Sequence, residues 1–265
     1  MNLRLLLAFC SLLLLPLAVS ANEAVKVGNE ALSIPLPQGF VRYDGINAAI
    51  DQVMQRFVAP SNRSLMVIAS PLDAERAKAG QPKDLIRFMS LQTARAVENE
   101  TATLRDFETL SAEVEKQFSP GGEGAATLQK EASKITQNAN LGLDLKLGET
   151  RMLGIYEKTK QSVDMGLLMK TQVGNGPVET MVAAASFLDV KGKVIFLYVY
   201  SDYHAQADAD WTQAVVKSWR QSIIAANPGE IPAGGFNWNS VLGKAVIGGI
   251  IGGVAGLLMK MFKRS

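Results

Sequence analysis

Cysteine and histidine are almost missing from this chain, since each occurs once in 265 residues. A single cysteine excludes an internal disulfide framework, and one cysteine with one histidine is too little for a zinc site built from these ligands. The sequence also lacks a G-x-S-x-G nucleophile elbow and a glycine-rich phosphate loop followed by Lys and Ser or Thr. We therefore expect no catalytic residue, no metal and no cofactor.

The chain also lacks a large excess of either charge, because it has 27 Lys and Arg and 25 Asp and Glu, a net charge of +2. Five of the basic residues lie near the two ends of the chain: Arg4, Lys244, Lys260, Lys263 and Arg264. Without these five, 22 basic and 25 acidic residues remain, a net charge of −3. A nucleic-acid-binding domain carries positive charge on its surface, so we expect no nucleic-acid partner.

Hydrophobic residues are plentiful, at 48% of the chain, enough for one substantial domain or two small ones. The apolar run Leu5–Leu15, followed by small residues up to Ala21, predicts a signal peptide over residues 1–21 with cleavage before Asn22. The alternative is an uncleaved anchor, for which this run is short. Cys10 lies inside the run, so we expect neither lipidation nor a cysteine in the mature protein.

A second apolar stretch covers residues 241–259, in which only Lys244 is charged. As a helix it would be about 28 Å long, enough to cross the core of a bilayer. The basic tail at residues 260–265 is then expected in the cytoplasm. The sequence thus predicts an exported domain over residues 22–226, a linker over 227–240 and one membrane span. We expect this protein in the inner membrane of a bacterium, with the domain facing the periplasm or the exterior.

Small residues repeat every four positions within this stretch, so one face of a predicted helix is almost bare backbone. They are Ala245, Gly248, Gly249, Gly252, Gly253 and Gly256. Such faces let membrane helices approach closely, which predicts a homo-oligomer or packing against the membrane helix of a partner protein. An ordinary anchor and a flexible glycine-rich tail on the membrane surface are the alternatives.

The first half of the exported domain alternates between extended and helical patterns. We expect an opening strand from Asn22 to Leu36, a short strand at 40–43, a helix at 46–57 and a buried strand at 64–70. The spacing of apolar residues then predicts helices over 83–97 and 102–118, with a weaker one over 126–137. Together these form a helical insert at about 83–137.

From Leu141 onward the apolar residues alternate, as in strands. The pattern predicts strands at 141–147, 150–158, 163–172, 178–190 and 193–202, joined by turns too short for parallel neighbours. The run Val194–Tyr200 is apolar on both faces and is expected at the centre of the sheet. A last helix should end near Ala226. The predicted fold class is α+β: an antiparallel sheet with helices on both faces (an α/β/α sandwich), plus a C-terminal transmembrane helix.

The single histidine, His204, follows the predicted central strand, next to Asp202 and Tyr203. These three residues are our candidates for ligand binding. The alternative is a polar loop whose aspartates cap the next helix. A rival hypothesis is an envelope hydrolase or metal-dependent enzyme centred on Asp202 and His204, which requires His204 in a deep pocket with convergent carboxylates.

Several of these features together resemble the PsbP-like and DcrB-like proteins. They are the turn Pro37-Gln38-Gly39-Phe40, the early helix, the antiparallel run ending in Lys193–Tyr200, and a last helix with Trp211 and Trp219. The resemblance implies an α/β/α sandwich and an extracytoplasmic role in binding or assembly without catalysis. It assigns no functional residue, and the helical insert departs from it. We therefore predict a non-enzymatic, membrane-anchored envelope protein whose domain binds a protein or a small ligand.

Overall fold

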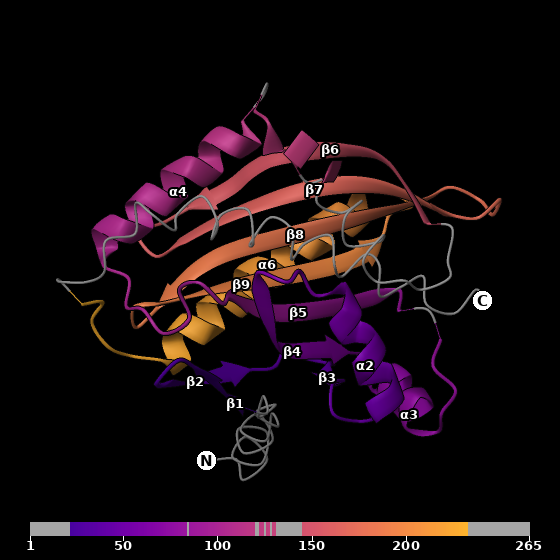
Figure 1. Ribbon diagram of the computed structural model, residues 1–265, viewed down its shortest axis with the longest axis horizontal. Helices are drawn as coiled ribbons and strands as arrows, with labels where there is room; N and C mark the ends of the chain where they lie inside the picture. The colour runs from indigo at the N-terminus through magenta and orange to yellow at the C-terminus, as the bar shows by residue number, and fades with distance from the viewer. Residues whose placement is uncertain are drawn as a thin grey trace, which may run out of the picture.

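The computed structural model describes residues 22–232 except 84, 120–121, 125, 128 and 131–144. The fold is mixed α+β, with a seven-stranded antiparallel sheet in the order β3-β4-β5-β9-β8-β7-β6 and a separate two-stranded hairpin, β1-β2 (Figure 1). The strands are β1 (Asn22–Val27), β2 (Glu30–Pro35), β3 (Val41–Arg42), β4 (Asn62–Ala69), β5 (Arg87–Ala94), β6 (Leu145–Lys158), β7 (Ser162–Val173), β8 (Glu179–Val190) and β9 (Lys193–Asp202). The helices are α2 (Ala48–Phe57), α3 (Pro71–Lys78), α4 (Leu104–Phe118) and α6 (Gln206–Ala226).

The prediction of a central strand is confirmed, because β9 is the middle strand of the large sheet. Every residue of β9 from Lys193 to Ser201 is buried. The turn that joins β8 to β9 has positive φ angles at both central residues, 55° at Lys191 and 80° at Gly192. Two positive φ angles define the type I′ turn, whose twist matches that of the two strands.

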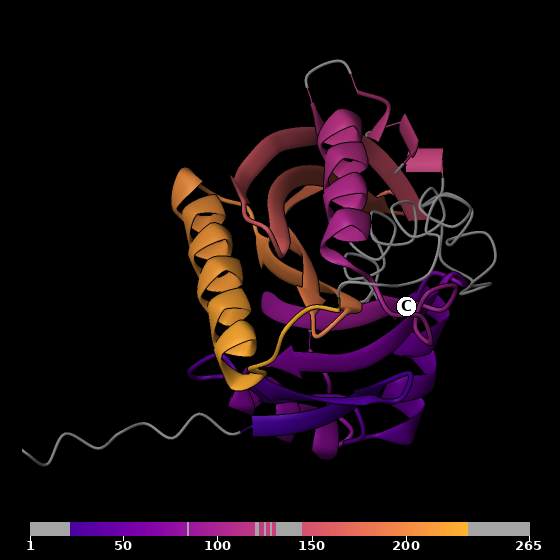
Figure 2. The same ribbon diagram turned by 90° about the vertical axis from the view of Figure 1, so that its left-hand side faces the viewer.

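Helices cover both faces of the large sheet, and Figure 2 shows α4 and α6 on opposite sides of it. Beneath α2, α3 and α4 the core contains aromatic rings, and Phe88 stacks on Tyr200 with ring centroids 4.5 Å apart. On the other face, α6 and the β1-β2 hairpin bury Trp219 and Ile223 against the aliphatic side chains of β4, β5, β8 and β9. Each face therefore has its own apolar core.

The last helix was predicted correctly and is tied to the hairpin by hydrogen bonds. The indole N–H of Trp219 donates to the carbonyl of Pro35 at 2.9 Å. The Asn227 side chain accepts from Ser33 N at 2.8 Å and donates to Ser33 O at 2.6 Å. These bonds satisfy backbone groups of β2 that have no strand neighbour on that side.

The predicted helix over 83–97 is wrong, since residues Arg87–Ala94 form β5. This strand lies between β4 and β9, and all of its residues after Arg87 are buried. Polar side chains interrupt the apolar pattern of this strand, so its sequence resembles part of an amphipathic helix. In the fold these side chains are hydrogen-bonded: Thr93 donates to the carbonyl of Val194 at 3.0 Å, and Gln92 accepts from Asn62 at 2.9 Å. The predicted helical insert therefore contains a core strand, and of its three helices α4 is confirmed.

The predicted single opening strand is also wrong, because it folds into the β1-β2 hairpin. Gly28 and Asn29 form the two-residue turn, with φ of 58° at Gly28, as expected for the first position of a type II′ turn. A Cβ atom on Gly28 would lie 2.4 Å from the carbonyl oxygen of Glu98, so the turn packs directly on the loop after β5. The short helix α3 was not predicted.

Within the described ranges, no helix combines the length and the apolar character needed to cross a membrane. The predicted signal peptide and the predicted span at 241–259, with its small residues from Ala245 to Gly256, lie outside the described residues. Most of the predicted helix at 126–137 lies outside them too.

Candidate functional site

The predicted ligand-binding residues lie at one end of the sheet, where β9 leads into α6. The backbone N–H of Asp202 donates to the carbonyl of Ile86 at 3.1 Å, and that of Tyr203 donates to the carbonyl of Thr180 at 2.9 Å. The segment is thereby fixed between the residue that precedes β5 and the second residue of β8. Asp202 and Tyr203 are half-buried, and His204 is exposed.

His204 does not lie in the deep pocket that the enzyme hypothesis requires. Its backbone N–H donates to Asp208 Oδ2 at 2.9 Å, and the N–H of Ala205 donates to the same oxygen at 3.2 Å. These bonds, that of His204 first, hold the pKa of the Asp208 carboxyl below its ordinary value. Among the described residues, no group of three His, Cys, Asp or Glu is placed to hold a metal ion. The aspartate thus caps α6, as the alternative reading of this loop expected.

Exposed apolar side chains gather at this same end. Four large apolar residues of the described part are exposed: Leu72, Ile86 and Val178 at 59% each and Leu104 at 42%. Leu72 lies in α3, which follows β4, while Ile86 precedes β5 and Val178 precedes β8. Three of the four therefore lie at the same end of the sheet as the last residues of β9, the right-hand end in Figure 1. We call Leu72, Ile86, Val178, Tyr203 and His204 the strand-end surface.

A cation–aromatic pair lies next to this surface. The Arg87 guanidinium lies 4.3 Å from the centroid of the Trp211 ring and 3.4 Å from Asp208 Oδ1. The Phe40 ring lies near that of Trp211, with ring centroids 6.2 Å apart. Tyr, Trp and Arg are the residues that most often dominate binding interfaces. Ile86 and Arg87 were not predicted as site residues because both fall within the predicted helix over 83–97, and the polar side chains of Arg87–Ala94 leave no clean strand pattern in the sequence.

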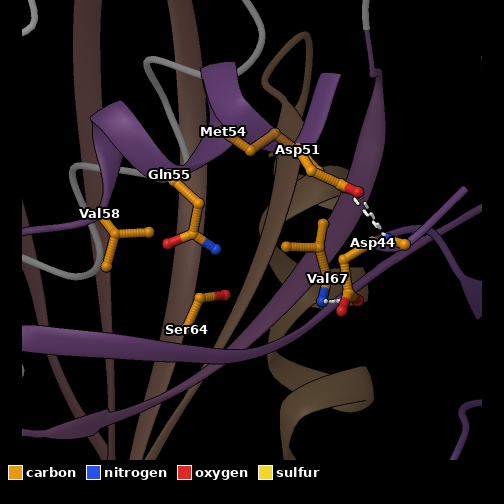
Figure 3. A pocket seen from close by; sticks show the side chains of 8 residues that line it. Asp44, Asp51, Met54, Gln55, Val58, Ser64 and Val67 are labelled. Atoms are coloured by element: carbon orange, nitrogen blue, oxygen red, sulfur yellow. Dashed lines mark hydrogen bonds between the residues drawn. The ribbon is translucent and has the colours of Figure 1, made fainter. Parts of the chain in front are cut away.

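A small pocket lies between α2 and β4, and Figure 3 shows its lining. Its volume is about 190 Å³, below the usual range of small-molecule sites. Asp44 accepts from Val67 N at 2.7 Å and from Arg42 Nη2 at 2.8 Å. Asp51 accepts from Gly45 N at 3.0 Å. Both carboxylates therefore hold the loop between β3 and α2, and we assign the pocket a structural role.

A buried ionic cluster lies between α6 and the sheet. Arg220 lies 3.2 Å from Asp164 and 3.2 Å from Glu157, and donates a short hydrogen bond to Ser162. Burial raises the pKa of the Asp164 carboxyl, which the charge of Arg220 opposes. Lys217 and Arg220 lower the pKa of Glu157. Because Arg220 and Asp164 are almost inaccessible, this cluster holds α6 in place and offers no site for a substrate.

No protein-family model matches the chain, and no curated protein matches it. Among solved structures, the cyanobacterial PsbP of Synechocystis sp. PCC 6803 is 14% identical with a TM-score of 0.37, over 80% of this chain and 94% of its own. A variant of protein Mog1 is 10% identical with a TM-score of 0.36, over 78% and 94%. The Saccharomyces cerevisiae Ran-binding protein Mog1p is 9% identical with a TM-score of 0.31, again over 78% and 94%. A PsbP structure is thus among the solved structures to which this chain is similar, and with TM-scores below 0.5 the similarity assigns no role to the chain.

Proposed function

We propose that this protein is an exported, non-enzymatic binding protein of the bacterial envelope, held in the inner membrane by residues 241–259. Its strand-end surface is the binding site, and the ligand is a segment of a partner protein. One observation carries this proposal: exposed apolar side chains gather at one end of the sheet, beside Tyr203 and the Arg87–Trp211 pair. Apolar patches rimmed by polar groups are typical of interaction sites.

Export and anchoring rest on the sequence. The apolar run Leu5–Leu15 before the small residues up to Ala21 supports export, and the apolar stretch 241–259 with one charged residue supports the anchor.

The chemistry of the described residues supports a role in binding rather than catalysis. His204 is exposed, and the carboxylates of Asp44, Asp51 and Asp208 are occupied by backbone N–H groups. A binding surface needs only apolar contact and a few oriented polar groups, which Tyr203, Arg87 and Trp211 supply.

Photocrosslinking from the two ends of the sheet tests the binding site. We would place a photoreactive phenylalanine analogue at Ile86 or at Leu104 in the full chain, because both positions are exposed and apolar but lie at opposite ends. In intact cells we expect a discrete protein adduct from position 86, several-fold stronger than from position 104. The adduct should weaken when Tyr203→Ala is added. Equal adducts from both positions, or none from position 86, would contradict the proposal.

A further inference from the structure

The chain leaves the folded domain at the end of the sheet opposite to the strand-end surface. After α6, the segment 227–232 runs over the turn between β8 and β9. A Cβ atom on Gly192 would lie 3.2 Å from Pro232 Cδ, and one on Gly229 would lie 3.6 Å from Lys191 Cγ. We call this the tether end; it lies on the left in Figure 1 and faces the viewer in Figure 2.

Cations without an acidic partner surround this exit point. Four exposed basic residues of the tether end make no ion pair with any described residue: Lys26, Arg95, Arg105 and Lys160. Other cations here are neutralised, as Arg63 is by Glu98 at 2.9 Å and Lys191 by Glu30 at 3.1 Å. The exposed cations thus remain available for an external anion.

Hydrogen bonds and close contacts join the loops and turns that carry the four cations. Lys26 is the second-last residue of β1, next to the turn that packs on Glu98, and Glu98 belongs to the loop that begins at Arg95. That loop leads into α4, which carries Arg105, and its Ala102 N–H donates to the carbonyl of Gly192 at 2.8 Å. Lys160 lies in the turn between β6 and β7, which accepts a bond from Asp189 N through Gln161 O.

An exposed leucine and few acids complete this surface. Leu104, 42% exposed, precedes Arg105 at the start of α4, and an apolar residue beside cations suits the interface between headgroups and acyl chains. Five acids near this end form no ion pair with the described residues: Glu100, Asp106, Glu108, Asp189 and Glu230. Only Glu108 and Glu230 among them are exposed, so the four exposed cations outnumber the exposed acids that lack an ion pair.

We infer that the tether end docks on anionic phospholipid headgroups of the bilayer that holds the C-terminal span. This inference rests on the anchoring in the proposed function and adds the orientation of the domain. The linker from Pro232 to the predicted span has eight residues, 233–240, which reach at most about 28 Å. The ten residues of β9 span about 33 Å, so the strand-end surface is directed away from the membrane.

The charge at the opposite end is consistent with this orientation. The carboxylates of Glu179, Asp202 and Asp210 lie where β8 begins and where β9 leads into α6. An anionic membrane surface repels carboxylates and attracts Lys and Arg within a Debye length. Docking through the tether end thus places the cations near the anionic headgroups and the carboxylates away from them. It leaves the proposed binding surface free for a partner.

Energy transfer from two matched positions tests the docking. Asn29 and Asn175 are both exposed and lie in hairpin turns, one at each end. In the full chain with Cys10→Ser, Asn29→Cys or Asn175→Cys would carry a donor dye. Each protein would be reconstituted in phosphatidylcholine vesicles that contain an acceptor lipid. One set of vesicles would also contain roughly 30% phosphatidylglycerol, to imitate an anionic leaflet.

The docking predicts at least about two-fold stronger transfer from position 29 than from position 175 in anionic vesicles at low salt. This difference should shrink in neutral vesicles or high salt, and also with Lys26→Glu combined with Arg95→Glu. The control pair Lys83→Glu with Arg151→Glu, exposed cations away from the tether end, should leave it unchanged. Thermal unfolding would check that each variant is folded.

Flotation of the same vesicles separates the two levels of the proposal. Transfer that is equal at both positions, stronger from position 175, or identical in neutral and anionic vesicles would overturn the docking while the chain still floats. A chain that does not float with vesicles would overturn the anchor, and the docking with it.

Discussion

Asp189 lies at the end of β8 with its side chain fully buried, and its Oδ1 accepts from Gly192 N at 2.8 Å. Its Oδ2 has no hydrogen-bond partner among the described residues. Burial raises the pKa of this carboxyl to about 7, and the charge of Asp106 adds to the effect. In the unfolded chain the pKa is about 3.9. The folded state therefore binds the proton more tightly, so the free energy of unfolding falls as pH rises from about 4 to 7.

Asp189→Asn should remove this pH dependence, because the amide keeps the acceptor for Gly192 and cannot ionise. We expect the variant to gain about 3 kcal/mol relative to the parent between pH 4.5 and pH 8. Urea unfolding of both proteins at the two pH values measures this gain. The other carboxylates contribute equally to the pH dependence of both proteins, so their contributions cancel in the difference. A difference between the two proteins that stays constant with pH would show that Asp189 is not the titrating group.

Arg220 is the second residue whose burial makes a clear prediction. Arg220→Met leaves Asp164 buried without its cation, which should lower the free energy of unfolding by about 3 kcal/mol. Lys217→Met is the matched control, since Lys217 also contacts Glu157, at 3.0 Å, but is 53% exposed. The control should lose less than about 1 kcal/mol in the same urea titration. Equal losses would mean that the buried pair contributes no more than a surface one.

At the scale of elements, β5 and the β1-β2 hairpin show where sequence patterns mislead. Residues Arg87–Ala94 contain polar side chains at positions that become buried, so neither a strand pattern nor a helix pattern is clean. Polar side chains can be buried at these positions because Thr93 is hydrogen-bonded to β9 and Gln92 to Asn62. The Gly28-Asn29 turn, by contrast, carried a readable signal, because Gly-Asn between two alternating runs is a hairpin pattern.

The predicted membrane span makes its own prediction at this scale. If its small-residue faces mediate self-association, Gly252→Ile or Gly256→Ile should lower the oligomer yield of the full chain by several-fold in a membrane association assay, because a large side chain separates the helix backbones. Leu258→Ile, a change between large residues on another stripe of the same stretch, is the control. Unchanged association in both glycine variants would exclude the glycine faces as the contact and leave the anchor in place.

At the scale of the whole molecule, the two ends of the sheet have different surfaces. The strand-end surface carries three exposed apolar side chains with Tyr203 and His204, whereas the tether end carries unpaired cations and the exit of the chain. A rigid antiparallel sheet keeps these two ends about 30 Å apart, as the length of β9 requires. In the proposed function one end therefore faces the bilayer and the other faces a partner.

The sequence by itself determined the local features of this protein: the α+β class, the antiparallel run that ends in β9, the hairpin turn at Lys191-Gly192 and the last helix. Each depends on periodicity or turn chemistry among neighbouring residues, which a sequence displays directly. It also singled out the segment Asp202–His204 by the scarcity of histidine. Only the tertiary structure brought Ile86, Arg87 and Val178 to that segment, because strands β5, β8 and β9 are neighbours in space but not all in sequence. The same pairing decided that Arg87–Ala94 is a strand, since hydrogen bonds to β4 and β9 outweigh the local helical spacing.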